Sequence, residues 1–472
     1  MKHIIERHEA YLKKKFNLAD EINRYLERIK KYQDLNAFIQ VYAEEALEQA
    51  QKLDARRDRG ENLGPLAGLT LAIKDNICYK DYRSTCASRI LENFISPYHS
   101  TVVKRILEAD GLILGKTNMD EFAMGSSNEN SYFGPVKNPI NPELVPGGSS
   151  GGSAVAVKTG MVDVALGSET GGSVRQPAAF CGIVGLKPSY GRISRFGLVA
   201  FASSLDQIGP LGKSVTDVAY LTKVIAGKDE QDSTSADIPV PDYMNFLGKD
   251  VSNLKVGVPR QYFQEGLNPE IKETIFKVRN FLKDNGAKII DLDLPTTDYA
   301  IATYYILATA EASSNLARYD GVRYGYRAKS TDLDTMYRTT RSEGFGTEVK
   351  RRIMLGTYVL SAGYYEAYYK KAQQVRRLIK NEFDRAFQVV DVILTPTTPT
   401  PPFKIGEKID DPLQMYLSDV YTVTANLAGI CGINIPVGQT QNGLPIGAQF
   451  MANAFKEELL FQVGDFIERN YS

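Results

Sequence analysis

Apolar residues recur every three or four positions over residues 22–31 and again over residues 41–57. This spacing places them on one face of a helix, so both segments are predicted to be helical. A short apolar run at residues 35–39 separates them. We therefore expect a helical lead-in over residues 1–60.

The pattern changes after this lead-in. From about residue 66 to residue 227, short apolar runs alternate with helical segments and with turns rich in glycine and proline. An apolar, β-prone run restarts at residues 254–258, and an amphipathic helix is predicted at residues 271–285. Residues 228–250 are expected to form an excursion of the chain between the half at about 66–227 and the half that begins at about residue 254.

Long helices are predicted at residues 301–317 and 348–387, followed by a buried strand at residues 389–394. Strands that alternate with helices are typical of an α/β fold. We expect a mixed central β-sheet covered by helices on both faces.

The composition indicates a globular protein with a large core, since 43% of the 472 residues are hydrophobic and 24% are charged. No internal repeat is visible, so a solenoid has no support. We expect a single domain over residues 61–472, with a core at about 66–227 and a remainder at about 254–472.

Basic and acidic residues balance, with 56 of each. Such a chain has no overall field that attracts nucleic acid or a membrane, so any RNA is expected to be held by a partner. The first fifteen residues are heavily charged, and no apolar run approaches the roughly 20 residues that span a bilayer. We expect a soluble, cytoplasmic protein that does not bind a membrane.

Four cysteines lie far apart in the sequence, without a C-x-x-C pair or a histidine cluster beside them: Cys78, Cys86, Cys181 and Cys431. A zinc site is therefore not expected. We expect reduced and mostly buried thiols instead.

Two glycine loops that contain serine carry the candidate chemistry, at residues 147–153 and 170–173. Apolar residues flank both loops, which indicates turns inside a packed domain rather than a flexible tether. Glycines let backbone N–H groups converge on one point, which suits either phosphate binding or acyl transfer. A P-loop is not formed at residues 111–117, because three residues separate the glycines where that motif requires four. That stretch is predicted to be a buried strand instead.

Histidine, the usual base for a serine nucleophile, is scarce. Of the three histidines, only His99 lies outside the charged amino-terminal stretch. Lys74 ends an apolar, β-prone run and is the best remaining base if it is neutral. Lowering its pKa from about 10.4 to near 7 requires roughly 3.4 units, or about 4.6 kcal/mol, which burial can supply. The alternative is a strand-terminal lysine that bridges to Asp75, whereas a catalytic role requires Asp75 to point to the other face.

Lys74, the loop at 147–153 and the segment 167–182 resemble the amidase signature family. The resemblance implies that Ser173 is the nucleophile, that Ser149 follows a cis peptide bond and bridges to the base, and that Lys74 is the base. One mild departure is a glutamate at position 169, where the family often has aspartate. Backbone N–H groups near the nucleophile are expected to hold the oxyanion, at Thr170, Gly171 and Gly172.

A longer resemblance, over nearly the whole chain, is to the glutaminase subunits of tRNA-dependent amidotransferases. It is carried by the segments 304–305, 310–321 and 344–353. It implies that Arg352 holds the carboxylate of glutamine, that Asp419 holds its amino group, and that Tyr304 lines the pocket. A planar guanidinium suits a carboxylate, and a carboxylate suits an ammonium.

Alternatives remain for these pocket residues. Arg351 is the alternative ligand for the carboxylate, because it adjoins Arg352 in a basic run. That run also fits a solvated face of a helix. Asp419 fits equally well as the cap of a helix over residues 420–427.

The resemblance also implies a reaction and its partners. The chain is expected to hydrolyse glutamine and to supply ammonia for converting Glu-tRNA(Gln) to Gln-tRNA(Gln), or Asp-tRNA(Asn) to Asn-tRNA(Asn). It is expected to need no cofactor itself and to form a heterotrimer with B and C subunits, with ATP and Mg used by the partner and mischarged tRNA held through the B subunit. Two alternatives are a stand-alone amidase for another small amide and a non-catalytic nucleotide-binding or scaffold protein.

Overall fold

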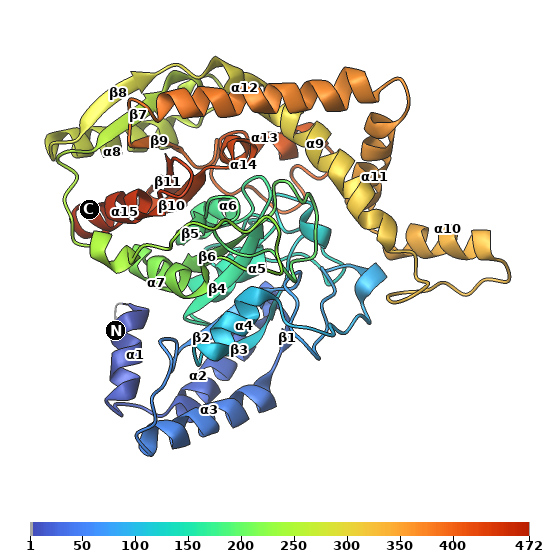
Figure 1. Cartoon of the computed structure of the whole chain (residues 1–472), viewed down its shortest axis with the longest axis horizontal. Helices are drawn as coiled ribbons and strands as arrows, with labels where there is room; N and C mark the ends of the chain where they lie inside the picture. The colour runs from blue at the N-terminus through green and yellow to red at the C-terminus, as the bar shows by residue number, and fades with distance from the viewer. Residues whose placement is uncertain (1–2, 472) are drawn as a thin grey trace.

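A mixed β-sheet runs through the molecule, which we describe from a computed structural model over residues 3–471. Within these residues the sheet has 11 strands in the order β1-β3-β2-β4-β6-β5-β10-β11-β9-β7-β8 (Figure 1). The pairs β2–β3, β2–β4, β7–β8 and β7–β9 are parallel, and the other pairs are antiparallel. The predicted mixed sheet is confirmed. The strands are β1 (Phe38–Val41), β2 (Thr70–Lys74), β3 (Leu112–Thr117), β4 (Val164–Glu169), β5 (Val184–Lys187), β6 (Gln207–Gly212), β7 (Lys255–Pro259), β8 (Lys288–Leu292), β9 (Val392–Pro396), β10 (Cys431–Gln439) and β11 (Pro445–Ala452).

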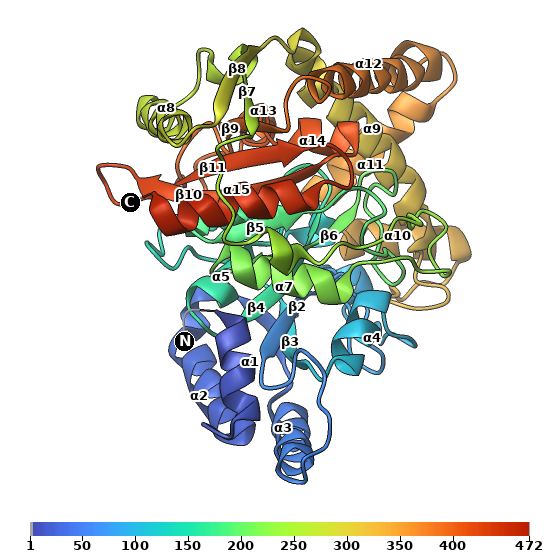
Figure 2. The same ribbon diagram turned by 60° about the vertical axis from the view of Figure 1, so that its left-hand side comes forward.

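Helices cover both faces of this sheet, as expected (Figure 2). On one face α4, α7 and α15 pack side by side, and α5 and α6 lie on the other. The helices α1 to α3 lie at one end of the molecule, and α8 and α12 lie at the other (Figures 1 and 2). The helices are α1 (Ile4–Leu12), α2 (Leu18–Lys31), α3 (Ala43–Asp58), α4 (Thr101–Glu108), α5 (Gly151–Lys158), α6 (Arg175–Cys181), α7 (Val215–Ile225), α8 (Pro269–Asp284), α9 (Ala300–Asn315), α10 (Leu333–Gly344), α11 (Thr347–Leu360), α12 (Lys371–Ala386), α13 (Pro412–Leu417), α14 (Val423–Ala428) and α15 (Glu457–Asn470).

Side chains of β2 alternate between the two faces. Leu71 and Ile73 are buried among residues of α4 and α7. Ala72 is buried among residues of α2, α3 and α5 on the opposite face. Because alternate residues share a face, Lys74 follows Ala72 toward α5. The strand thus aims its terminal lysine at the glycine loop that precedes α5.

Most predicted elements are present with shifted ends, but the long helix predicted at residues 348–387 is wrong as a single element, because it is divided into α11 and α12. The apolar run at 111–117 forms the buried strand β3, as predicted. The predicted lead-in contains three helices, but its apolar run forms β1, which pairs with β3 and adds an edge strand to the sheet. The predicted strand at 389–394 begins only at Val392, because the backbone N–H groups of residues 389 and 390 still bond to the end of α12. The proposed domain boundaries stay predictions.

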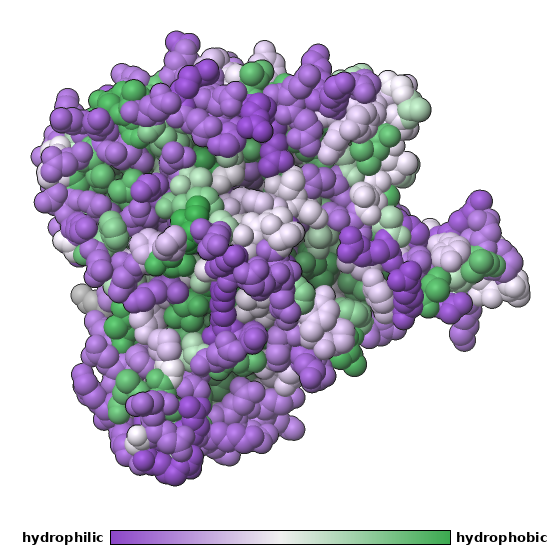
Figure 3. Space-filling model, viewed as in Figure 1, coloured by the Kyte–Doolittle hydropathy of each residue, from purple (hydrophilic) through white to green (hydrophobic). Residues whose placement is uncertain are grey.

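Polar residues dominate the face shown in Figure 3, with scattered apolar patches between them. No helix within residues 3–471 combines the length and the apolar character needed to cross a membrane. The four cysteines are buried and form no disulfide. Over the same described range, no cluster of three or more histidine, cysteine, aspartate or glutamate side chains could hold a metal ion.

Candidate active site

Lys74 lies at the end of β2 and is fully buried. Its Nζ lies 2.7 Å from Ser149 Oγ, 2.8 Å from Ser150 Oγ and 3.1 Å from the carbonyl oxygen of Ser168. The Ser150 hydroxyl donates to that same carbonyl, over 3.0 Å, so it accepts from the lysine. A neutral amine that donates to Ser150 and Ser168 keeps its lone pair for the hydroxyl of Ser149. The arrangement therefore suits proton transfer from Ser149 to Lys74.

The protonation state of Lys74 is set mainly by burial. Burial lowers the pKa of Lys74 from 10.5 to about 7, against the opposing charges of Asp120, Asp206 and Glu169. Lys74 nevertheless forms no ion pair within the described residues. A large fraction of this side chain is therefore an uncharged amine at neutral pH.

Asp75 points away from Lys74, as the strand alternation predicts. Its carboxylate accepts hydrogen bonds from the backbone N–H of Thr85, at 3.0 Å, and from the Thr85 hydroxyl. It lies 3.9 Å from Nζ of Lys116, which is also fully buried. The alternative of a bridge between Lys74 and Asp75 is therefore wrong, and the aspartate pairs with a different lysine.

The first glycine loop is part of the core and not a tether. Residues 147–153 are buried and lead directly into α5. The peptide bond between Gly148 and Ser149 is cis, as the resemblance implies. The N–H of Gly148 donates to Oε1 of Gln176 over 2.9 Å, which ties this loop to α6.

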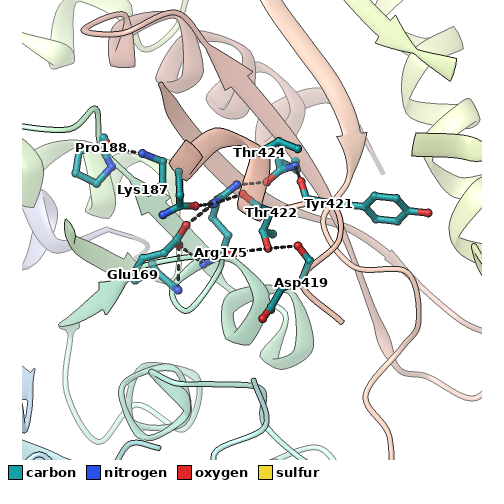
Figure 4. A network of polar contacts seen from close by, with 12 residues as sticks. Glu169, Arg175, Lys187, Pro188, Asp419, Tyr421, Thr422 and Thr424 are labelled. Carbon is teal, nitrogen blue, oxygen red and sulfur yellow. Dashed lines mark hydrogen bonds and ion pairs between the residues drawn. The ribbon is translucent and has the colours of Figure 1, made fainter. Parts of the chain in front are cut away.

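A buried ion pair holds the second glycine loop (Figure 4). The carboxylate of Glu169 accepts from the backbone N–H groups of Val174, at 3.0 Å, and Arg175, at 3.1 Å, and it pairs with the Arg175 guanidinium. The same guanidinium donates to the Thr422 carbonyl over 2.9 Å and to Oδ1 of Asn426 over 2.8 Å. The network joins the loop to α14.

Ser173 lies in this loop beside the first one. Its carbonyl accepts from the N–H of Ser150 over 3.1 Å, and the residue is 8% exposed. The Ser173 hydroxyl makes no hydrogen bond to any residue between 3 and 471, so a direct link to Ser149 is not formed in this structure. Hydrogen bonds between catalytic groups are often long before substrate binds.

The predicted oxyanion groups follow β4. No acceptor within residues 3–471 bonds to the backbone N–H of Gly171, Gly172 or Ser173. The Thr170 side chain is held by Asp206, because its hydroxyl donates to Oδ1 over 2.7 Å. The loop therefore presents free N–H groups next to Ser173, which is what an oxyanion needs.

Tyr304 and Asp419 both lie against this loop. A Cβ placed on Gly171 would lie 2.6 Å from Cζ of Tyr304, and one on Gly172 would lie 3.4 Å from Oδ1 of Asp419. Glycine at position 171 is what allows the tyrosine to approach so closely. Asp419 accepts a hydrogen bond of 2.5 Å from the Ser126 hydroxyl, and burial raises its pKa to about 7.

Asp419 does not cap a helix with its side chain. The helix begins at Val423, and the N–H groups of Thr422 and Val423 bond to the backbone carbonyl of Asp419. The carboxylate faces Ser126 instead. The capping alternative is therefore wrong.

Arg352 is buried in the core and is not a solvated helix charge. Its side chain is 3% exposed, against 39% for Arg351. Its Nε donates to Oε1 of Glu348 over 2.8 Å. The guanidinium lies 5.2 to 5.6 Å from three ring centroids, those of Tyr305, Tyr416 and Phe201. The charges of Arg352 and Asp419 interact, and Arg352 opposes the rise in the pKa of Asp419.

A cavity of about 500 Å³ opens beside Arg352. Glu348, Arg351 and Tyr416 also line it, whereas neither Ser173 nor Lys74 is among its described lining residues. The cavity is thus an approach to Arg352, and the serine loops lie outside it.

Several contributors escaped the sequence analysis. Ser150 lies in the first glycine loop but was given no role, whereas Ser126 and Asp120 lie outside both loops, and only the fold brings them to Asp419 and Lys74. Of these residues, Ser126 was the easiest to find from the sequence, because the two serines after Gly125 resemble the serines of the other glycine loops. His99 contacts Lys80 and the Tyr79 ring instead, which leaves the lysine as the base.

The family model described as Amidase matches residues 20–461. The chain is 58% identical over 436 residues to the A subunit of glutamyl-tRNA(Gln) amidotransferase from Koribacter versatilis, covering 92% of this chain and 91% of that protein. The protein of that name from Heliobacterium modesticaldum is 54% identical over 460 residues, covering 97% of this chain and 94% of its own length. The crystal structure of the same subunit from Thermotoga maritima matches with a TM-score of 0.80 and 45% identity, over 95% of this chain and 91% of that chain.

Proposed function

The chain belongs to the amidase family, and from this premise we propose that it is the glutaminase subunit of a glutamyl-tRNA(Gln) amidotransferase. The observation that carries the proposal is the buried Lys74, whose pKa is lowered to about 7, with Ser149 Oγ 2.7 Å from its Nζ. The names of its relatives and its pocket residues support glutamine as the substrate.

In the proposed reaction, Ser173 attacks the side-chain amide carbon of glutamine while its proton passes through Ser149 to Lys74. The backbone N–H groups of Gly171 and Gly172, together with that of Thr170, hold the oxyanion. The C–N bond then breaks, and Lys74 returns the proton through Ser149 so that ammonia leaves. Water hydrolyses the γ-glutamyl ester on Ser173 and releases glutamate.

Arg352 is proposed to bind the α-carboxylate of glutamine, and Asp419 is proposed to bind its α-ammonium group. Tyr304 is proposed to form part of the pocket wall. Arg352 is preferred over Arg351 because it is buried and interacts with both Asp419 and Tyr304. An ionised Asp419 attracts an ammonium, whereas a protonated one does not.

We further propose that the chain works in the cytoplasm within a heterotrimer with B and C subunits. Its relatives are named as one lettered subunit of an amidotransferase, which supports such an assembly. ATP, Mg and the mischarged tRNA are assigned to the partner subunits, which fits the balanced charge of this chain. Whether Glu-tRNA(Gln) or Asp-tRNA(Asn) is amidated depends on those partners.

The test is ammonia release by the complex co-expressed with its B and C subunits, from glutamine and from a panel of other small amides. Glutamine is expected to be the preferred substrate, and Gln-tRNA(Gln) is expected to form when ATP and Glu-tRNA(Gln) are added. Activity confined to amides other than glutamine would favour a stand-alone amidase and overturn the proposal.

A further inference from the structure

Glu348 lies in the first turn of α11 and joins three side chains beside the cavity. One oxygen accepts from Nε of Arg352 over 2.8 Å and from the Tyr416 hydroxyl over 3.1 Å. The other oxygen pairs with Arg351. Glu348 is only 9% exposed, so this carboxylate is held between two helices, α11 and α13.

We propose that Glu348 is a positioning residue that turns the free nitrogen atoms of Arg352 toward the α-carboxylate of glutamine, and thereby selects substrates that carry this group. The inference rests on the proposed function, since it assigns a role within the same pocket. It concerns specificity and not the chemical step at Ser173.

The orientation of Arg352 follows from the geometry of a guanidinium, which presents its N–H groups in a fixed plane. Glu348 occupies Nε, whereas Nη1 and Nη2 have no partner among residues 3–471. Three aromatic rings surround the group, and cation–π attraction disfavours its rotation out of their midst. With Nε fixed, the two Nη atoms form the edge that remains for a carboxylate.

Tyr416 connects this arrangement to α13. Its ring stacks on that of Tyr305 with centroids 3.8 Å apart and an interplanar angle of 24°, and its hydroxyl reaches Glu348. Of the two stacked rings beside Arg352, that of Tyr416 comes from α13 and that of Tyr305 comes from α9. Glu348 is the group that both α13 and Arg352 contact by hydrogen bonds.

The charge of Glu348 has the opposite effect on glutamine binding. The negative charge of Glu348 partly neutralises Arg352 and by itself weakens the attraction for a substrate carboxylate. If orientation dominates, removing Glu348 weakens glutamine binding; if charge dominates, removal strengthens it. We expect orientation to dominate, because an unanchored guanidinium loses the geometry that two parallel hydrogen bonds require.

The experiment compares two substrates in the intact complex: glutamine, and 4-aminobutanamide, which is glutamine without its α-carboxylate. Glu348→Ala removes the anchor, and Glu348→Gln keeps one acceptor oxygen without the charge. Glu366→Ala is the matched control, since this glutamate forms an exposed ion pair with Lys370. Tyr416→Phe removes only the hydroxyl and serves as the mild variant if a substitution at position 348 fails to fold.

Glu348→Ala is expected to raise KM for glutamine roughly 10- to 100-fold, the range for hydrogen bonds to charged groups, with kcat nearly unchanged. Glu348→Gln and Tyr416→Phe should give smaller rises, and KM for 4-aminobutanamide should stay the same in all variants. A lower or unchanged KM for glutamine, or equal losses with both substrates, overturns the proposal. If the unsubstituted complex releases no ammonia from glutamine, the proposed function itself fails.

Discussion

Replacing Lys74 with methionine should abolish ammonia release and at the same time stabilise the protein. The amine is fully buried, and its pKa falls from 10.5 to about 7 on folding. A decrease of that size corresponds to about 5 kcal/mol of folding free energy when the lysine is protonated in both states. Methionine has a similar length and carries no charge, so it avoids this cost.

The sign of the pH dependence follows from proton uptake. Between about pH 7 and 10.5 the unfolded chain holds a proton on Lys74 that the folded chain has released, so folding stability rises with pH. At pH 7.5 the remaining cost is about 4 kcal/mol. The substitution also removes the hydrogen bonds from Lys74 to Ser149 and Ser150, which offsets part of this gain. The Ser150 hydroxyl still donates to the carbonyl of Ser168, so we expect about 1 to 3 kcal/mol of net stabilisation.

The assay is urea unfolding of both proteins at several pH values from 7 to 10. The stability advantage of Lys74→Met should shrink toward high pH by up to about 1.4 kcal/mol per pH unit. An advantage that stays constant or grows with pH would show that burial does not depress the pKa of this lysine. The proton relay would then lose its base.

Activity of the unchanged enzyme provides a second readout of the same group. Because catalysis requires neutral Lys74, protonation of this group alone should make kcat/KM for glutamine fall about tenfold per pH unit well below pH 7. The pKa of Asp419 is also raised to about 7, so kcat/KM should fall more steeply than kcat on the acid side. A kcat/KM that is independent of pH from 5 to 9 would contradict both assignments.

The remaining predictions concern single side chains. Ser173→Ala should abolish ammonia release without changing the circular dichroism spectrum, and full activity in that variant would exclude it as the nucleophile. Arg352→Ala should raise KM for glutamine at least tenfold, whereas Arg351→Ala should change it much less; the reverse order in steady-state kinetics would exchange their roles. Glu169→Gln should lower the free energy of unfolding by about 3 to 5 kcal/mol, measured in urea, because it leaves the buried Arg175 charge uncompensated; a loss below about 1 kcal/mol would show that other partners suffice.

Local patterns predicted the strand that ends at Lys74 and the burial of the first serine loop, because these signals are short-range. The apolar run before Lys74 indicated a buried strand, and its two-residue period placed Lys74 and Asp75 on opposite faces, as the structure shows. The flanking apolar residues correctly marked the loop at 147–153 as part of the core.

The pocket was harder to predict because its contacts span long stretches of sequence. Glu348 and Arg352 are one helical turn apart, so their pairing follows from spacing alone. The burial of Arg352 does not, since it depends on Tyr416 and on Phe201, 151 residues away. The same is true of Asp419, whose carboxylate is directed by Ser126, 293 residues distant, rather than by its own helix.

Burial alone does not identify the base, because the structure contains other fully buried lysines. Lys116 lies beside Asp75, whose charge favours the ammonium form. Burial lowers the pKa of Lys187 to about 8, yet its one hydrogen bond within residues 3–471 goes to the carbonyl of Pro188, which has no proton to exchange. Lys74 combines a lowered pKa, the absence of an ion pair with any described residue, and a hydroxyl partner in the glycine loop. It is this combination, and not desolvation by itself, that equips one lysine to accept a proton.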